Sequence, residues 1–210
     1  MFVDLTLGPL SEPLTGKHWD VRAVAERVQR RLGFYARKDV AIGDRVFLHH
    51  GNTPEFFFDL AAIWTLGGCA VPIDARLTAF EIETLARAAL PRFSLCAGAP
   101  DQALGRALSS LSIAVLDANE ADAEAPQDRM PAGSLVGLDR DALILFTSGT
   151  TGEPKGVVHT HRSLRARWAA LRHSLGIAPF RRTLCLLPTH FGDVLSITNW
   201  DLRMLHSMVA

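Results

Sequence analysis

The sequence predicts an α/β protein in which a mainly parallel β-sheet is flanked by helices. Short apolar runs alternate with amphipathic stretches through the first half of the chain. The connections between them are short, which is typical of strand–helix–strand units. Hydrophobic residues make up 48% of the 210 residues and charged residues 21%, so the chain is expected to fold around a core.

Apolar periodicity and start and stop signals predict the helices. In residues 19–37, Val21, Val24 and Val28 lie on one face, and the arginines are expected on the opposite, solvent-facing side. Residues 52–55, Asn-Thr-Pro-Glu, are typical of a helix start because a polar cap precedes proline and an acid. The predicted helices cover residues 19–37, 52–66, 78–90, 100–108 and 162–175.

Short apolar runs bounded by glycine, proline or polar residues predict the strands. They cover residues 45–50, 69–73, 92–96, 112–116, 142–146, 156–160 and 183–187. Between Asp117 and Asp141, seven acids alternate with Ala, Pro and Gly, which indicates a solvated connection. We therefore divide the chain into an α/β subdomain (15–117), an acidic connection (118–140), a hairpin, helix and strand (141–192) and a tail (193–210).

Composition excludes several functional classes. Lys plus Arg and Asp plus Glu number 22 each, so no global field attracts nucleic acid or an anionic membrane. The longest uncharged apolar stretch, residues 60–73, is shorter than the roughly 20 residues that span a bilayer. The first residues lack the pattern of a secretory signal. Cys69, Cys96 and Cys185 are too dispersed for a disulfide framework or a zinc site. A cytoplasmic protein without a membrane span or a metal site of its own is expected.

The most unusual segment is residues 145–156, Leu-Phe-Thr-Ser-Gly-Thr-Thr-Gly-Glu-Pro-Lys-Gly. Its glycines allow close backbone approach, and the backbone N–H groups of such a loop can converge on an anion. Ser148, Thr150 and Thr151 add hydroxyl donors, and Lys155 adds one of only three lysines in the chain. The segment is a candidate polyphosphate cradle, although its spacing differs from a Walker A loop. The alternative is a turn rich in Gly, Ser and Thr that binds no ligand.

Residues 146–161, Phe-Thr-Ser-Gly-Thr-Thr-Gly-Glu-Pro-Lys-Gly-Val-Val-His-Thr-His, resemble the signature of the adenylate-forming superfamily. This superfamily includes acyl- and aryl-CoA ligases, luciferases and the adenylation domains of nonribosomal peptide synthetases. Upstream, residues 52–74, NTPEFFFDLAAIWTLGGCAVPID, resemble the helix–Gly–VPID segment of the same superfamily. The resemblance extends from about residue 19 to residue 190. It implies that the chain is a partial N-terminal domain of the adenylate-forming fold.

The resemblance implies a two-step reaction and a set of site residues. A small carboxylic acid attacks the α-phosphate of ATP to give an acyl-adenylate and pyrophosphate, and a thiol, commonly CoA, then displaces AMP. Mg²⁺ bridges the phosphates, and Lys155, as the catalytic residue, neutralises charge on the departing pyrophosphate. His190 lies in a segment that partly matches the aromatic-His lining of the acyl pocket. The residues implied to bind the ATP phosphates are Thr147, Ser148, Gly149, Thr150, Thr151, Gly152 and Lys155.

The sequence also departs from the family pattern. Members carry a later Tyr-Gly-x-Thr-Glu segment, an Asp that binds the ribose and a C-terminal Lys, none of which occurs in this sequence. Residues from Asp193 onward do not resemble the expected continuation. We therefore expect a truncated ligase or one whose reading frame is lost near Asp193, with weak ATP affinity and apolar surface that favours self-association. The alternative function is a non-catalytic remnant with weak or no nucleotide binding.

Two further patterns have a functional and a structural interpretation. Arginines at 162, 165, 167, 172, 181 and 182 cluster near Lys155, but the lack of interleaved aromatic residues and the zero net charge favour a solvated helix face over a nucleic-acid patch. His159 and His161 are expected on one face of a strand. Packing is favoured over a metal pair because no Cys or carboxylate lies nearby in sequence.

Overall fold

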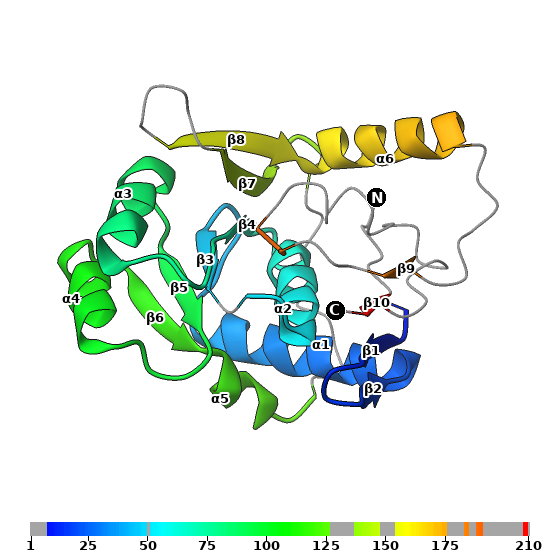
Figure 1. Cartoon of the computed structure of the whole chain (residues 1–210), viewed down its shortest axis with the longest axis horizontal. Helices are drawn as coiled ribbons and strands as arrows, with labels where there is room; N and C mark the ends of the chain where they lie inside the picture. Colours follow the sequence, from blue (N-terminus) through cyan, green and yellow to red (C-terminus); the bar gives the residue numbers. More distant parts are fainter. Residues whose placement is uncertain are drawn as a thin grey trace.

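A six-stranded sheet forms the centre of the protein (Figure 1). The structure, a computed structural model, describes residues 8–49, 51–126, 137–147, 154–175, 183–184, 188–190 and 208–209. The strand order is β6-β5-β3-β4-β7-β8, with β8 antiparallel to β7 and the other pairs parallel, which confirms the predicted fold class. The strands are β3 (Arg45–His49), β4 (Cys69–Pro72), β5 (Phe93–Cys96), β6 (Ala114–Asp117), β7 (Asp141–Thr147) and β8 (Lys155–Thr160).

Two small two-stranded sheets complete the strands, and of these strands the sequence predicted only the one at residues 183–184, within its predicted strand 183–187. One is an antiparallel pair of β1 (Leu10–Glu12) and β2 (Lys17–Trp19). The other is a parallel pair of β9 (Thr183–Leu184) and β10 (Met208–Val209). Because Trp19 belongs to β2, the first helix begins two residues later than predicted.

Helices cover both faces of the sheet, which makes a three-layer arrangement (Figure 1). Strand β3 shows the alternation: Val46 and Leu48 pack in the core on one side, whereas Phe47 packs in the core on the other. The first face holds α1 (Val21–Arg37), α2 (Pro54–Thr65) and α5 (Ala118–Asp122). The second holds α3 (Ala79–Ala89) and α4 (Gln102–Ser110), and α6 (His161–Leu175) follows β8.

Helix α2 is buried on nearly all sides, as its apolar sequence predicts for a central helix. At its C-terminal end, the Trp64 indole Nε1 donates a hydrogen bond to the Ala142 carbonyl oxygen of β7 at 2.6 Å. The chain then turns sharply into β4 at Gly68, where a Cβ atom would lie 2.9 Å from Ile63 Cγ2. Glycine is therefore required at position 68. Through the Trp64 hydrogen bond, α2 is held against β7, the strand that leads into the candidate loop.

The prediction that the arginines of the first helix face solvent is wrong for Arg31, whose side chain is completely buried. Its Nε atom lies 2.6 Å from Asp59 Oδ1 of α2, and its Nη1 atom lies 2.6 Å from Asp122 Oδ1 of α5. The Tyr35 hydroxyl donates to the same Asp59 carboxylate. Burial by itself would lower the pKa of Arg31, but the carboxylates of Asp59 and Asp122 outweigh this effect and raise the pKa. The three helices on this face are thus joined by one buried charge cluster.

The acidic segment is more ordered at its start than the sequence predicted. Residues Ala118–Asp122 form α5, Asp117 caps its N-terminus, and Ala118 and Ala121 are buried. The carboxylate of Asp122 lies 2.6 Å from the guanidinium of Arg27 in α1, in addition to its contact with Arg31. The apolar side chains and the arginines of α1 therefore explain a helix where the high acid content had suggested a solvated connection. The division of the chain at residues 117 and 141 stays a prediction.

Replacing Arg31 by Met is expected to lower the free energy of unfolding by about 3–5 kcal/mol, because the Asp59 carboxylate would stay buried without its main cation. Urea denaturation followed by circular dichroism measures the change. Arg22→Met is the control, since the Arg22 side chain on the same helix is 88% exposed. Equal stability of the two variants would contradict the structural role of the cluster.

Candidate functional site

The carboxyl ends of the parallel strands form the edge of the sheet at which the candidate residues lie. Strands β3, β4 and β7 are consecutive along this edge. The chain leaves β3 toward α2 on one face and leaves β4 toward α3 on the opposite face. Such a reversal leaves a crevice between the two strand ends, and ligands of open α/β sheets bind there.

The predicted phosphate loop emerges next to this crevice, between β7 and β8. Thr147 ends β7 and Lys155 begins β8, and the two residues are register partners. Both are exposed, and the Thr147 hydroxyl donates a long hydrogen bond of 3.5 Å to the Lys155 carbonyl oxygen. Ser148, Gly149, Thr150, Thr151 and Gly152 lie outside the described residues. The structure therefore places the two ends of the loop together at the mouth of a hairpin.

Strand alternation fixes the faces of this hairpin. Ile144 and Phe146 pack toward α3 and α4, so Thr147 and its partner Lys155 lie toward the side of α1 and α2. Gly156 follows directly, and a Cβ atom there would lie 3.1 Å from Ile144 Cγ2. A side chain at position 156 would therefore crowd the strand that carries the loop.

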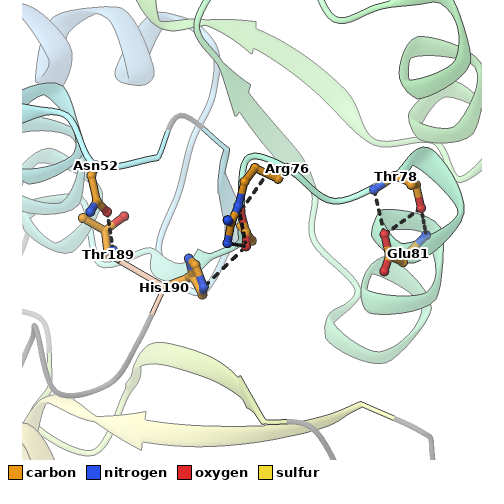
Figure 2. Close-up of polar contacts among 7 residues, drawn as sticks. Asn52, Arg76, Thr78, Glu81, Thr189 and His190 are labelled. Atoms are coloured by element: carbon orange, nitrogen blue, oxygen red, sulfur yellow. Dashed lines mark hydrogen bonds and ion pairs between the residues drawn. The ribbon is translucent and has the colours of Figure 1, made fainter. Parts of the chain in front are cut away.

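A short turn at residues 188–190 docks in the crevice between β3 and β4 (Figure 2). The backbone N–H of Thr189 donates to Asn52 Oδ1 at 2.6 Å, and its hydroxyl donates to the Gly51 carbonyl oxygen at 3.1 Å. Nε2 of His190 lies 3.7 Å from Asp74 Oδ2. Three segments far apart in the sequence therefore meet at the edge where the phosphate loop emerges.

The charges in this crevice are arranged by Arg76. Its Nη2 atom lies 2.7 Å from Asp74 Oδ2, and its Nε and backbone N–H donate to Asp74 Oδ1. These hydrogen bonds lower the pKa of Asp74 to about 2, so the group is a carboxylate at neutral pH. Burial lowers the pKa of His190, while Asp74 opposes that effect. Near neutral pH, a mainly uncharged imidazole ring therefore faces a carboxylate.

The structure partly corrects the helix start that the sequence predicted at residues 52–55, because α2 begins at Pro54. Thr53 is the N-cap of α2, but its side chain makes no capping hydrogen bond. The side-chain oxygen of Asn52 accepts a hydrogen bond from the backbone N–H of Thr189. Asp74 is a turn residue, because Thr78 caps α3 in a capping box with Glu81 (Figure 2).

The expectation that His159 and His161 share a strand face is wrong, because β8 ends at Thr160 and His161 begins α6. The His161 ring packs edge-on against Trp64 with centroids 5.7 Å apart, and burial lowers its pKa. This contact supports packing as its role. Across the residues described, no group of three or more His, Cys, Asp or Glu side chains could hold a metal ion.

Two other predictions concern thiols and membranes. Cys69 and Cys96 are buried and form no disulfide. Burial raises the pKa of the Cys69 thiol to about 12, which suppresses the reactive thiolate. None of the helices in the described ranges has the length and apolarity needed to cross a membrane.

Comparison with known proteins identifies the family. The model of the family described as AMP-binding enzyme matches residues 14–198. The chain belongs to this family. Among curated relatives, a long-chain-fatty-acid–CoA ligase of Mycobacterium tuberculosis is 33% identical over 167 residues, which cover 71% of this chain and 31% of the ligase. The crotonobetaine/carnitine–CoA ligase of Citrobacter koseri is 31% identical over 164 residues, covering 71% of this chain and 32% of that ligase. The chain thus spans about a third of the length of these ligases.

Solved structures agree with the fold of this AMP-binding chain. The inhibitor-bound N-terminal domain of FACL13 from Mycobacterium tuberculosis superposes with a TM-score of 0.82 at 25% identity, covering 98% of this chain and 53% of that domain. ATP-bound MatB from Rhodopseudomonas palustris gives a TM-score of 0.84 at 22% identity, covering 99% of this chain and 42% of that protein. The prediction of an N-terminal portion of the adenylate-forming fold is confirmed.

Sequence reasoning missed Asn52 and Asp74 as parts of the site, and it assigned Asn52 only to the start of the second helix. The available signal was their place just after the two adjacent strands at 45–49 and 69–72, at the edge where ligands of such sheets bind. The contact of these residues with positions 189 and 190 could not be predicted, because it spans more than 100 residues of chain.

Substitution of His161 by Phe is expected to reduce the loss of stability in acid. In the folded chain the pKa of His161 is below its ordinary value of about 6.5. The contribution of the neutral ring to stability is therefore fully present above that pH and is lost as the pH falls below it. Urea denaturation at about pH 7.5 and about pH 5 measures the difference. The control is His173→Phe, an exposed position of the same helix that places the same ring elsewhere. Identical acid losses in wild type and His161→Phe would contradict the prediction.

Proposed function

We propose that this chain is the N-terminal part of an ATP-dependent carboxylate-activating ligase and that residues 147–155 bind the phosphates of ATP. The observation that carries the proposal is the pairing of Thr147 with Lys155 at the mouth of the β7–β8 hairpin. This pairing closes a loop rich in Gly, Ser and Thr at the carboxyl edge of the sheet. Membership of the AMP-binding family and the likeness to CoA ligases support the assignment.

In the proposed reaction, a carboxylate oxygen of a small acid attacks the α-phosphorus of ATP. The bond from that phosphorus to the oxygen bridging to the β-phosphate breaks, and pyrophosphate leaves with its electrons. The sulfur of a thiol, by our proposal CoA, then attacks the acyl carbonyl carbon. The bond from that carbon to the phosphate oxygen of AMP breaks, AMP leaves with its electrons, and the thiol proton is lost to solvent. The chain contributes mainly by positioning the phosphates and stabilising their charge.

Each loop residue has a role in this proposal. Lys155 brings a mobile positive charge to the phosphate that leaves, and the hydroxyls of Thr147, Ser148, Thr150 and Thr151 donate hydrogen bonds to the β- and γ-phosphates. Gly149 and Gly152 allow the backbone N–H groups to approach. Mg²⁺, when bound with ATP, would neutralise charge between the phosphates.

The docked turn at 188–190 supports His190 as a wall of the acyl pocket. Its ring lies in the crevice beside β4, and β4 is the neighbour of the strand that ends in the loop. Which acid enters such a pocket depends on its full lining. A cytoplasmic location and self-association through exposed apolar surface remain parts of the proposal.

Replacing Lys155 by Ala is expected to weaken binding of ATP and of tripolyphosphate by about 10- to 100-fold. A hydrogen bond to a charged group contributes about 1.5–3 kcal/mol, and each 1.4 kcal/mol corresponds to about tenfold in affinity. Isothermal titration calorimetry measures both ligands. Lys17→Ala is the matched control, because Lys17 lies in β2 of a separate small sheet. Equal losses in the two variants, or none in either, would contradict a phosphate site at Lys155.

Activity separates the ligase from the non-catalytic alternative. ATP–pyrophosphate exchange is measured for the chain with a panel of aliphatic and aromatic acids. Exchange that depends on one acid and is lost in Lys155→Ala supports the ligase. Binding of ATP that depends on Lys155 but gives no exchange with any acid favours a nucleotide-binding chain without turnover.

A further inference from the structure

We propose that Asn52 and Asp74 are positioning residues that hold the turn at 188–190 in the crevice between β3 and β4 and orient the His190 ring. The positioning is independent of any ligand. What His190 then does for a substrate rests on the proposed function above.

The first support is the place of the docked turn in the fold. In a sheet of this topology, the crevice between the ends of β3 and β4 is where a ligand is expected, since the chain leaves these strands toward opposite faces. Here residues 189 and 190 of the protein itself contact the loops that follow β3 and β4 (Figure 2). A side chain from a distant segment therefore lies at the edge of the sheet where β7 ends at Thr147.

The second support is the way Thr189 is held. The residue is only 3% exposed, and both its backbone N–H and its hydroxyl are hydrogen-bonded to the loop after β3. Asn52 supplies the acceptor for the N–H through a side-chain oxygen. A buried N–H without an acceptor is costly, so loss of this oxygen favours release of the turn.

The third support is the direction of the His190 ring. Nε2 points toward Asp74 at 3.7 Å, a distance at which charge acts although no hydrogen bond forms. Asp74 is itself held by the hydrogen bonds from Arg76, which orient its carboxylate toward the ring. Asp74 raises the pKa of His190 and Arg76 lowers it, and the loop after β3 contributes the uncharged Gly51 and Asn52.

Replacing Asp74 by Asn separates a direct action of the Asp74 carboxylate on the His190 ring from a general effect on the packing of the turn. The carboxylate raises the pKa of His190 and Arg76 lowers it, so Asp74→Asn is expected to lower the pKa of His190 further. If the substitution merely loosened the turn, the ring would gain solvent and its pKa would rise toward the ordinary value of about 6.5. The two explanations thus predict opposite signs.

The measurement is a histidine NMR titration of the 210-residue chain, with the His190 signals assigned by their absence in His190→Gln. Asp101→Asn is the matched control, because Asp101 follows β5 at the same edge of the sheet and caps α4 instead of facing His190. A lower His190 pKa in Asp74→Asn, with no change in Asp101→Asn, is the expected result. A rise, no change, or equal shifts in both variants would overturn the role of Asp74.

The role of Asn52 is tested by hydrogen exchange of the Thr189 amide in the same chain. Asn52→Ala is expected to accelerate this exchange by about fivefold or more, the loss expected for one hydrogen bond. Asn52→Asp keeps an acceptor oxygen and should restore protection. Unchanged exchange in Asn52→Ala, or no recovery in Asn52→Asp, would overturn the role of Asn52. Both measurements are made without nucleotide, so a failure of ATP binding leaves their outcome intact.

Discussion

The ion pair between Arg31 and Asp59 is the interaction on which the layer of helices α1, α2 and α5 depends. A helix that is buried on nearly every side can carry a carboxylate at its centre only if a cation is buried with it. The arginine comes from α1, and its other nitrogen reaches Asp122 of α5. The position of α2 is therefore set by charge as well as by apolar packing.

Helix α2 transmits this position to both ends of the candidate site. Its last turn holds β7 through the hydrogen bond from Trp64, and β7 leads into the phosphate loop. The residue two positions before its first turn, Asn52, holds the turn at 188–190. One helix therefore fixes two of the segments that meet at the carboxyl edge. Loss of a buried charge in α1 or α2 is therefore expected to displace the segments that meet at the site, although neither charge lies in the site itself.

The sequence predicted the helices and strands whose formation depends on residues that are close together in the chain. Periodicity, caps and glycines predicted the alternating elements, and the string at 146–161 predicted the family that the comparisons then confirmed. It failed where the outcome depends on long-range pairing. Arg31 looked solvent-facing because its partners, Asp59 and Asp122, lie 28 and 91 residues further along the chain. The segment after Asp117 looked solvated because the arginines of α1 that pair with its Asp122 lie far away in the sequence. The docking of Thr189 on Asn52 has no local signature at all.

The most direct test of the account is to map where ATP touches the chain by amide NMR, with adenosine as the comparison. If the phosphates bind at the mouth of the β7–β8 hairpin, ATP shifts the amide signals of Thr147 and Lys155, and adenosine at the same concentration leaves them in place. If ATP instead shifts only amides along the arginine-rich helix α6, or shifts the same signals as adenosine, the phosphate loop is not the site and the proposed function is contradicted.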